Sequence, residues 1–167
     1  MKKGVILGID PGTRISGYGL ICLQSHGYES IDYGCIRPPA HYKLSDRYLI
    51  IYESIATLIE QYQPSALVVE TQYVNKNVQS ALKLGMARGM ALIAAKQKGI
   101  SVFEYAPSEA KRAVVGSGKA SKFQVQSMVQ QLLKLKSPPH PEDAADALAL
   151  AICHAHQASH LQASKEI

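Results

Sequence analysis

The chain lacks tryptophan, has only three cysteines and contains no long uninterrupted apolar run. The cysteines, Cys22, Cys35 and Cys153, are odd in number and lack the spacing of a metal site, so we expect free thiols in a reducing compartment. No segment approaches the ~20 apolar residues that span a bilayer, and the turn at residues 10–12 ends the first apolar run too early for a signal peptide. These absences predict a cytoplasmic protein without a membrane partner.

Acidic residues are also scarce: the chain has 13, against 18 lysines and arginines, which leaves a net charge of +5. The excess is concentrated between Pro107 and Lys136, where Glu109 is the one acid and the basic residues are Lys111, Arg112, Lys119, Lys122, Lys134 and Lys136. A basic segment of this kind is typical of proteins with a polyanionic partner. An ordinary solvated surface has the same composition, so the segment alone does not decide between the two.

The length of 167 residues and the hydrophobic content of 47% favour one folded domain with its own core. We expect this domain to span residues 1–157 and the polar residues 158–167 to form a frayed tail. Hydrophobic periodicity and turn residues predict strands at 4–10, 18–24, 28–36, 66–70 and 101–105, and helices at 44–62, 78–98, 107–114, 121–134 and 142–157. An antiparallel meander followed by alternating helices and strands predicts an α/β fold, with a five-stranded mixed sheet flanked by helices.

Four carboxylates stand where acids are costly unless they are paired or bind a cation. Asp10 and Glu70 each end an apolar run that is expected to be a buried strand. Asp143 and Asp146 are three residues apart in the last predicted helix, so both project from one face. Together the four offer hard oxygen donors for Mg²⁺, and the basic surroundings suggest a phosphodiester substrate.

Each acid also has a simpler explanation. Asp10 precedes a proline and a glycine, as many turn aspartates do, and the helix dipole favours acids such as Asp143 and Asp146 at a helix start. Glu70 is harder to explain in this way, because it follows four apolar residues on a strand that should be central. Carboxylates from three separate elements are a more specific signal than any one of them.

The chain resembles the RuvC family of Holliday junction resolvases. The resemblance rests on GIDPG at 8–12 with GYG at 17–19, on Glu70, on SALKLGMARG at 80–89, on VVG at 114–116 and on DAADALA at 143–149. These motifs follow one another from about residue 4 to 156, which is nearly the whole chain. The resemblance implies an RNase H-like fold, in agreement with the order of elements expected above.

By this resemblance, Asp10, Glu70, Asp143 and Asp146 are the family's four catalytic, metal-binding acids. Some members carry histidine at the third position, where this chain has Asp143. The implied reaction is phosphodiester hydrolysis with two Mg²⁺ ions per subunit, or Mn²⁺ as a substitute, giving 5′-phosphate and 3′-hydroxyl ends. Our hypothesis is that Asp10 bridges the two ions, with Glu70 and Asp146 on one side each.

The resemblance further implies contacts with DNA. Lys111 and Lys122 match family lysines near the scissile phosphate, and Tyr73 matches an aromatic residue that stacks at the junction centre. Each of the three has a plain alternative as a solvated lysine or a packing aromatic. Weaker candidates for DNA contact are Arg14, Lys76, Arg88 and Lys119.

The implied partners are four-way junction DNA, a second copy of the chain and the RuvA–RuvB branch-migration complex. A junction has two-fold symmetry, so two symmetric nicks call for a homodimer with two active sites. The helix expected at 78–98 carries small residues at Ala81, Gly85, Gly89 and Ala91, and interior glycines, which cost about 1 kcal/mol each, suggest close approach of another backbone. A dimer interface and packing against the chain's own sheet both fit.

Three other functions agree with part of the sequence. A nuclease of the same fold could act on structured RNA. A single-domain actin-like or sugar-kinase-like ATP-binding protein would also open with an aspartate in a turn like that at 10–13, but such proteins close two domains over ATP. A binding protein with an inactive site is disfavoured by the intact set of acids. The favoured function is therefore an endodeoxyribonuclease that resolves Holliday junctions in recombination and repair.

Overall fold

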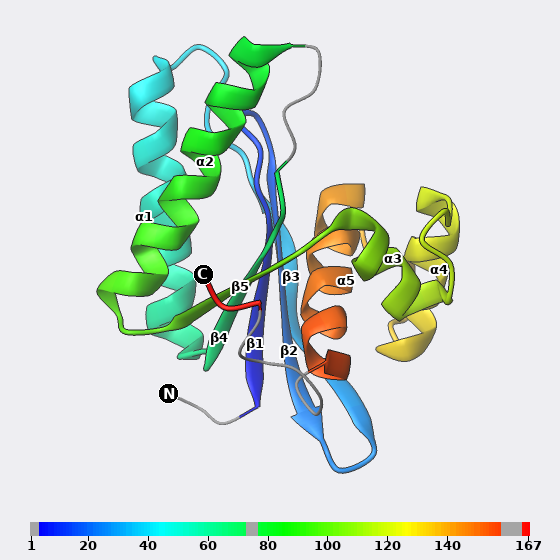
Figure 1. Cartoon of the computed structure of the whole chain (residues 1–167). Helices are drawn as coiled ribbons and strands as arrows, with labels where there is room; N and C mark the ends of the chain where they lie inside the picture. Colours follow the sequence, from blue (N-terminus) through cyan, green and yellow to red (C-terminus); the bar gives the residue numbers. More distant parts are fainter. Residues whose placement is uncertain (1–3, 73–76, 158–164) are drawn as a thin grey trace.

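The computed structural model describes residues 4–72, 77–157 and 165–167 (Figure 1). All ten expected elements are found, and their ends differ from the expected ones by two residues at most. The strands are β1 Val5–Asp10, β2 Ser16–Gln24, β3 Gly27–Ile36, β4 Ala66–Glu70 and β5 Ser101–Tyr105. The helices are α1 Leu44–Tyr62, α2 Val78–Gln97, α3 Pro107–Val115, α4 Lys122–Leu132 and α5 Glu142–Gln157.

The five strands form one mixed sheet in the order β3-β2-β1-β4-β5. Strands β1 to β3 make the expected antiparallel meander, whereas β4 and β5 run parallel to β1. Tight turns suffice between antiparallel strands, and α1 and α2 carry the chain back along the sheet to begin the parallel ones. The carboxyl ends of β1 and β4 are consequently neighbours, and β3 and β5 are the edges.

Helices cover both faces of the sheet: α1 and α2 pack on one face, and α5 with α3 and α4 on the other (Figure 1). Each face has its own apolar core. In β1, Leu7 and Ile9 belong to the core under α1 and α2, while Ile6 belongs to the core under α5, as the alternation of side chains along a strand requires. Because β1 is buried on both faces, its sequence reads as a continuous apolar run.

Helix α2 has two different sides. Ala87, Ala91 and Ala94 are buried in the core beneath α1 and α2, so small residues of this helix do pack against the chain's own sheet. On the opposite side Leu82 and Met86 are exposed to 60% and 53%. Burial against the sheet therefore does not account for all of the apolar residues of α2.

Of the tail expected at 158–167, the structure describes residues 165–167, and residues 158–164 lie outside the described residues. Residues 165–167 lie along the outer edge of β5, where the Glu104 N–H donates to the carbonyl of Lys165 at 3.1 Å and the Ile167 N–H donates to the carbonyl of Val102 at 2.9 Å. An edge strand offers unpaired backbone groups, and the tail satisfies two of them. The expectation of fraying rested on polar side chains, whereas the contact of residues 165–167 is made by the backbone. The domain boundary at residue 157 stays a prediction.

The cysteines are free thiols, as expected, with Cys153 buried and Cys22 and Cys35 half-buried. Separately, none of the helices within the described ranges combines the length and apolar character needed to cross a membrane.

Candidate active site

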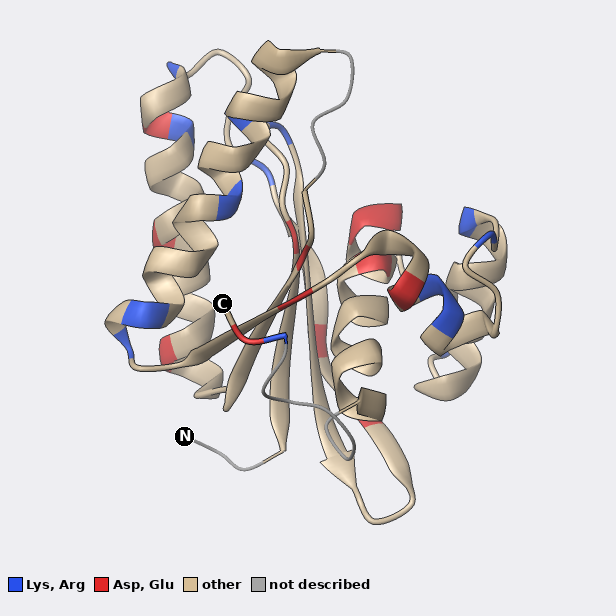
Figure 2. Ribbon diagram, viewed as in Figure 1, with Lys and Arg blue, Asp and Glu red and all other residues tan. Residues whose placement is uncertain are grey.

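The four acids come from three elements that meet at one end of the sheet. Asp10 and Glu70 are the last residues of the neighbouring parallel strands β1 and β4. Asp143 and Asp146 lie in the first part of α5, which packs on the sheet over β1 and β2. Figure 2 shows acidic segments at the ends of these strands and at the start of α5, with basic segments on α3 and around α4 beyond them.

Two glycines let α5 approach the sheet closely enough to bring the acids together. A Cβ added to Gly17 would lie 1.9 Å from the carbonyl oxygen of Asp143, and one added to Gly8 would lie 2.0 Å from that of Ala147. Both are closer than any real contact, so only glycine is accommodated at these positions. Gly17 is also the β2 partner of Asp10. The glycines of the first motif therefore position the α5 aspartates beside Asp10.

A cavity of about 180 Å³ opens between the strand ends, α3, α4 and α5. Its walls include three of the four acids, Asp10, Glu70 and Asp146, and both lysines expected near the scissile phosphate, Lys111 and Lys122. Asp143 does not line the cavity but lies close enough to Asp10 and Asp146 to raise the pKa of each. The structure thus brings together all four acids and two of the predicted basic residues.

Asp10, Glu70 and Asp146 resist ionisation in this setting. Burial, reinforced by the charges of Glu70, Asp146 and Asp143, raises the pKa of Asp10 to about 8. Burial is also the main cause of the raised pKa of Glu70 and of Asp146, and Lys111 acts in the opposite direction on both. A buried carboxylate among other carboxylates is stable in its charged form only beside a cation.

The donor chemistry of this site fits a hard divalent cation. Carboxylate oxygens are the ligands that Mg²⁺ prefers, commonly with water and substrate phosphate completing the shell. Within the described ranges, no three acidic, histidine or cysteine side chains are grouped closely enough to hold an ion as they stand. Repulsion among the carboxylates opposes a closer grouping, so a cation would have to draw them together.

Lys122 is held at the rim of the cavity by Glu142, the first residue of α5. Its Nζ lies 2.8 Å from Oε2 of Glu142, and this hydrogen bond is the main cause of the raised pKa of Lys122. Glu142 therefore links α4 to the start of α5. The pair is largely exposed, so it contributes little to the stability of the fold and serves mainly to orient the Lys122 side chain.

Arg88, one of the predicted DNA contacts, has partners within the protein. Its Nη2 lies 2.6 Å from Oε2 of Glu104 on β5, and its Nε donates to the backbone carbonyl of Glu70 at 3.2 Å. The guanidinium is thus engaged inside the protein, directly behind one of the four acids. The sequence offered no signal for Glu104 as the partner, because the two residues meet only when α2 folds over β4 and β5.

The remaining predicted DNA contacts divide into two groups. Arg14, in the loop after β1, and Lys119, before α4, are exposed and near the site in sequence. Tyr73 and Lys76 lie outside the described residues. A residue that sequence reasoning missed is Arg47 on α1, whose Nη2 donates to the carbonyl of Thr13 and so ties down the loop that carries Arg14.

Comparison with known proteins agrees with this geometry. The family model for RuvC, crossover junction endodeoxyribonuclease, matches residues 6–154. This chain belongs to the RuvC family. A RuvC of Protochlamydia amoebophila is 68% identical over 151 residues, which are 90% of each chain, and one of Chlamydia pneumoniae is 50% identical over 157 residues, 92% of this chain and 94% of that one.

Among solved structures, Thermus thermophilus RuvC in complex with a Holliday junction substrate superimposes with a TM-score of 0.91. It is 32% identical, and the match covers 98% of this chain and 99% of that one. RuvC membership confirms the RNase H-like fold expected from the motifs, and it disfavours the ATPase and RNA-nuclease alternatives. The roles of the individual acids and bases stay predictions.

Proposed function

We propose that this RuvC-family chain cuts four-way DNA junctions by symmetric paired nicks. Two divalent metal ions would be bound by four acids, Asp10, Glu70, Asp143 and Asp146. Mg²⁺ is the proposed working ion, and Mn²⁺ is a proposed substitute. The observation that carries the proposal is the single cavity that joins carboxylates from β1, β4 and α5 to Lys111 and Lys122. Acids alone would suit many metal proteins. Acids faced by lysines suit a phosphodiester, whose negative charge grows as the bond to the leaving oxygen breaks.

The chain's own residues have separate tasks in this reaction. Asp10, with its raised pKa, is charged at neutral pH only when positive charge is close, so it is the acid best suited to lie between two ions. Lys111 and Lys122 would hold the phosphate and stabilise the developing charge. When bound, the two ions would supply an activated water and stabilise the leaving 3′-oxygen. The cut strand would then have a 3′-hydroxyl at one end and a 5′-phosphate at the other.

DNA beyond the cut site would lie over the basic surface next to the cavity. Arg14 and Lys119 are exposed and are proposed as phosphate contacts, which set position and not sequence preference. Tyr73 remains the proposed stacking residue at the junction centre, with Lys76 nearby. Arg88 is the one member of the predicted set that we no longer expect to touch DNA, because its guanidinium already binds Glu104 and Glu70.

A homodimer through α2 is part of the proposal. Val78, Leu82, Met86 and Ile93 are exposed to between 48% and 60%, and at 100° per residue they form one stripe opposite the buried alanines. Gly89 lies in the same stripe, and nothing comes within 4 Å of the position its Cβ would take, which leaves room for a second backbone. An exposed apolar stripe of this kind marks an interaction surface, and a two-fold partner suits a two-fold substrate.

Family resemblance supports two further parts of the proposal, a cytoplasmic location and cooperation with a RuvA–RuvB branch-migration complex. Neither has a counterpart among the contacts described above.

The deciding experiment compares cleavage of a synthetic mobile four-way junction with that of a linear DNA duplex of the same sequence and of a four-way RNA junction. Each substrate is incubated with the full-length chain in Mg²⁺ and in Ca²⁺, and the products are tested for resealing by DNA ligase. We expect paired, resealable nicks in the DNA junction alone and only with Mg²⁺. Equal cutting of duplex and junction would refute junction selectivity, and cutting of the RNA alone would move the substrate to RNA.

A matched variant tests the acids themselves. Asp146→Asn keeps the shape of the side chain and removes its charge, so it should abolish cleavage while leaving junction binding in Ca²⁺ within about twofold. Normal nicking by this variant would remove Asp146 from the metal site.

A further inference from the structure

Residues 165–167 pair with the outer edge of β5, the strand that precedes α3 in the sequence. Glu166 forms an antiparallel bridge with Phe103, between the two backbone hydrogen bonds that join Glu104 to Lys165 and Ile167 to Val102. Helix α3 begins at Pro107, two residues after the end of β5. The tail therefore lies against the strand from which α3 starts.

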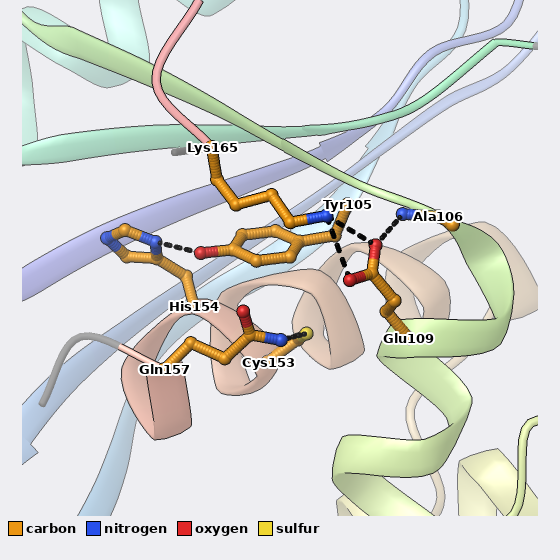
Figure 3. Close-up of polar contacts among 7 residues, drawn as sticks. All are labelled: Tyr105, Ala106, Glu109, Cys153, His154, Gln157 and Lys165. Atoms are coloured by element: carbon orange, nitrogen blue, oxygen red, sulfur yellow. Dashed lines mark hydrogen bonds and ion pairs between the residues drawn. The ribbon is translucent and has the colours of Figure 1, made fainter. Parts of the chain in front are cut away.

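The Lys165 side chain reaches from the tail to α3 (Figure 3). Its Nζ lies 2.9 Å from Oε1 and 3.1 Å from Oε2 of Glu109, and 5.7 Å from the centre of the Tyr105 ring. Glu109 Oε2 also accepts a hydrogen bond of 2.8 Å from the backbone N–H of Ala106, the residue that caps α3. One carboxylate thus binds both the first turn of α3 and the end of the chain.

The side chains beneath this contact are buried and hydrogen-bonded. The Tyr105 hydroxyl and Nδ1 of His154 are hydrogen-bonded at 2.9 Å, and the His154 ring packs against Phe103 with 4.3 Å between ring centres. Tyr105 and His154 are both buried, and burial lowers the pKa of His154 to about 4, so the ring is neutral at ordinary pH. Through its ion pair with Glu109, Lys165 therefore links α3 to a buried, packed part of the core.

Helix α3 carries residues of the candidate active site. Pro107, Ala110 and Lys111 line the acid cavity, and Lys111 follows Glu109 by only two residues in a helix of nine. A small rotation of α3 about its first turn would move the Lys111 ammonium relative to the acids. Misplacement of a reacting group by about 1 Å can cost on the order of 100-fold in rate.

We propose that residues 165–167 form a strap that positions α3, and that Lys165 is a positioning residue for Lys111, acting through Glu109. The proposal rests on the proposed function of the acid cavity. Lys165 itself is not assigned a contact with DNA, because its ammonium is bound to Glu109 and only a third of its side chain is exposed. The strap contributes to the rate of cleavage and not to the affinity for DNA.

The test uses two variants of the full-length chain that change charge in opposite directions. Lys165→Met removes a positive charge, and Glu109→Gln removes a negative one while keeping a side chain that can cap α3. Single-turnover cleavage of a four-way junction is measured in Mg²⁺, and junction affinity in Ca²⁺. We expect both variants to cleave about two- to fivefold more slowly, with affinities within about twofold of the original, since a partly exposed ion pair contributes only modestly.

Two controls separate positioning from general effects. Lys165→Arg keeps the ion pair and should recover most of the rate, whereas Lys98→Met, an exposed lysine at the far end of α2, should leave the rate unchanged. Melting temperatures are recorded for all variants, and a loss confined to variants that have begun to unfold at the assay temperature would overturn the proposal. Weaker junction binding by Lys165→Met, with tighter binding by Glu109→Gln, would also overturn it in favour of a direct charge effect on DNA.

A double-mutant cycle tests the route through Lys111. If Lys165 acts by positioning Lys111, then Lys165→Met should cause no further loss of rate in a Lys111→Met background. Independent losses that multiply would overturn that route. Failure of the strap is distinguishable from failure of the proposed function: in the first case the unaltered chain cuts the junction and Lys165→Met cuts it equally fast, and in the second the unaltered chain does not cut it.

Discussion

The Nε of Arg88 donates a hydrogen bond of 3.2 Å to the backbone carbonyl of Glu70, while its Nη2 binds Glu104 at 2.6 Å. One side chain of α2 thereby holds the end of β4 against β5 at the residue that supplies a candidate metal ligand. Arg88 is only 18% exposed and Glu104 32%, so solvent screens this pair less than the pair of Lys122 and Glu142.

Replacing Arg88 with Gln should therefore slow cleavage much more than it weakens DNA binding. We expect about a 10- to 100-fold loss of rate in Mg²⁺, with junction affinity in Ca²⁺ changed by less than about threefold. The slope of affinity against salt concentration should stay the same, because a residue that contacts no phosphate releases no counterion. A reduced slope with an unchanged cleavage rate would restore Arg88 to the DNA surface.

Glu104→Gln is the matched variant. It removes an acid, so a purely electrostatic effect on DNA would tighten binding, whereas loss of positioning would slow cleavage. We expect slower cleavage, by less than in Arg88→Gln, because the hydrogen bond from Arg88 to Glu70 remains.

Gly17→Ala tests whether α5 needs its close contact with β2. The added methyl would lie 1.9 Å from the carbonyl oxygen of Asp143, so α5 must shift and carry the aspartates away from Asp10. We expect a loss of about 1–3 kcal/mol in the free energy of unfolding, measured by urea denaturation, together with loss of cleavage. Asp143→Asn is the comparison, since it should lose cleavage and keep its stability. An alanine variant as stable and active as the original would contradict this account of the glycine motif.

The sequence was sufficient to predict the fold and to select four acids that lie close together, because both depend on strong local signals; the roles of the acids stay predictions. Apolar runs and turn residues mark β1 and β4, and Asp10 and Glu70 are conspicuous because each ends such a run. The family motifs then supplied the RNase H-like topology, which periodicity alone had given only as an α/β layered sheet.

Contacts between distant segments were the part that sequence could not predict. Arg88 on α2 binds Glu104 on β5, and Glu142 at the start of α5 binds Lys122 on α4. The pairing of residues 165–167 with β5 could not be predicted for the same reason, since it is made by the backbone. Gly8 and Gly17 were recognised as parts of a motif, but the physical need for them appears only when α5 is placed on the sheet.

Asp10 makes the stability of the chain depend on pH in the absence of metal. Its pKa is about 8 in the folded chain, against an ordinary value of 3.8. The folded state thus holds this proton more tightly than the unfolded state, and the resulting stability is complete below about pH 4 and is lost as the pH rises through 8. At pH 8 the ionised carboxylate is a net cost to folding.

Asp10→Asn should consequently stabilise the chain in EDTA by about 2–4 kcal/mol at pH 8 and by much less at pH 5. Urea denaturation at the two pH values measures the difference, and Glu53→Gln, an exposed acid of α1, is the control. Mg²⁺ should raise the melting temperature of the original chain at pH 8 and that of Asp10→Asn far less. A gain that is the same at both pH values would show that Asp10 ionises normally.

Met86→Glu tests the proposed dimer through α2. Met86 lies in the middle of the exposed stripe with Leu82 and is 53% exposed, so a carboxylate there should not disturb the fold of one subunit. Two such charges facing each other across a two-fold axis would be desolvated and repel. In analytical ultracentrifugation we expect the original chain to sediment as a dimer and the variant as a monomer at micromolar concentration.

Loss of the dimer should also change the pattern of cleavage. A junction in a supercoiled plasmid, cut by two linked active sites, is linearised within one binding event, whereas a monomer should leave nicked circles. Lys83→Gln, on another side of α2, changes the net charge by the same amount and should keep both the dimer and the linear product. If Met86→Glu is monomeric but still produces linear plasmid at the original rate, paired cutting does not require the dimer. If Met86→Glu is still a dimer, the α2 stripe is not the interface.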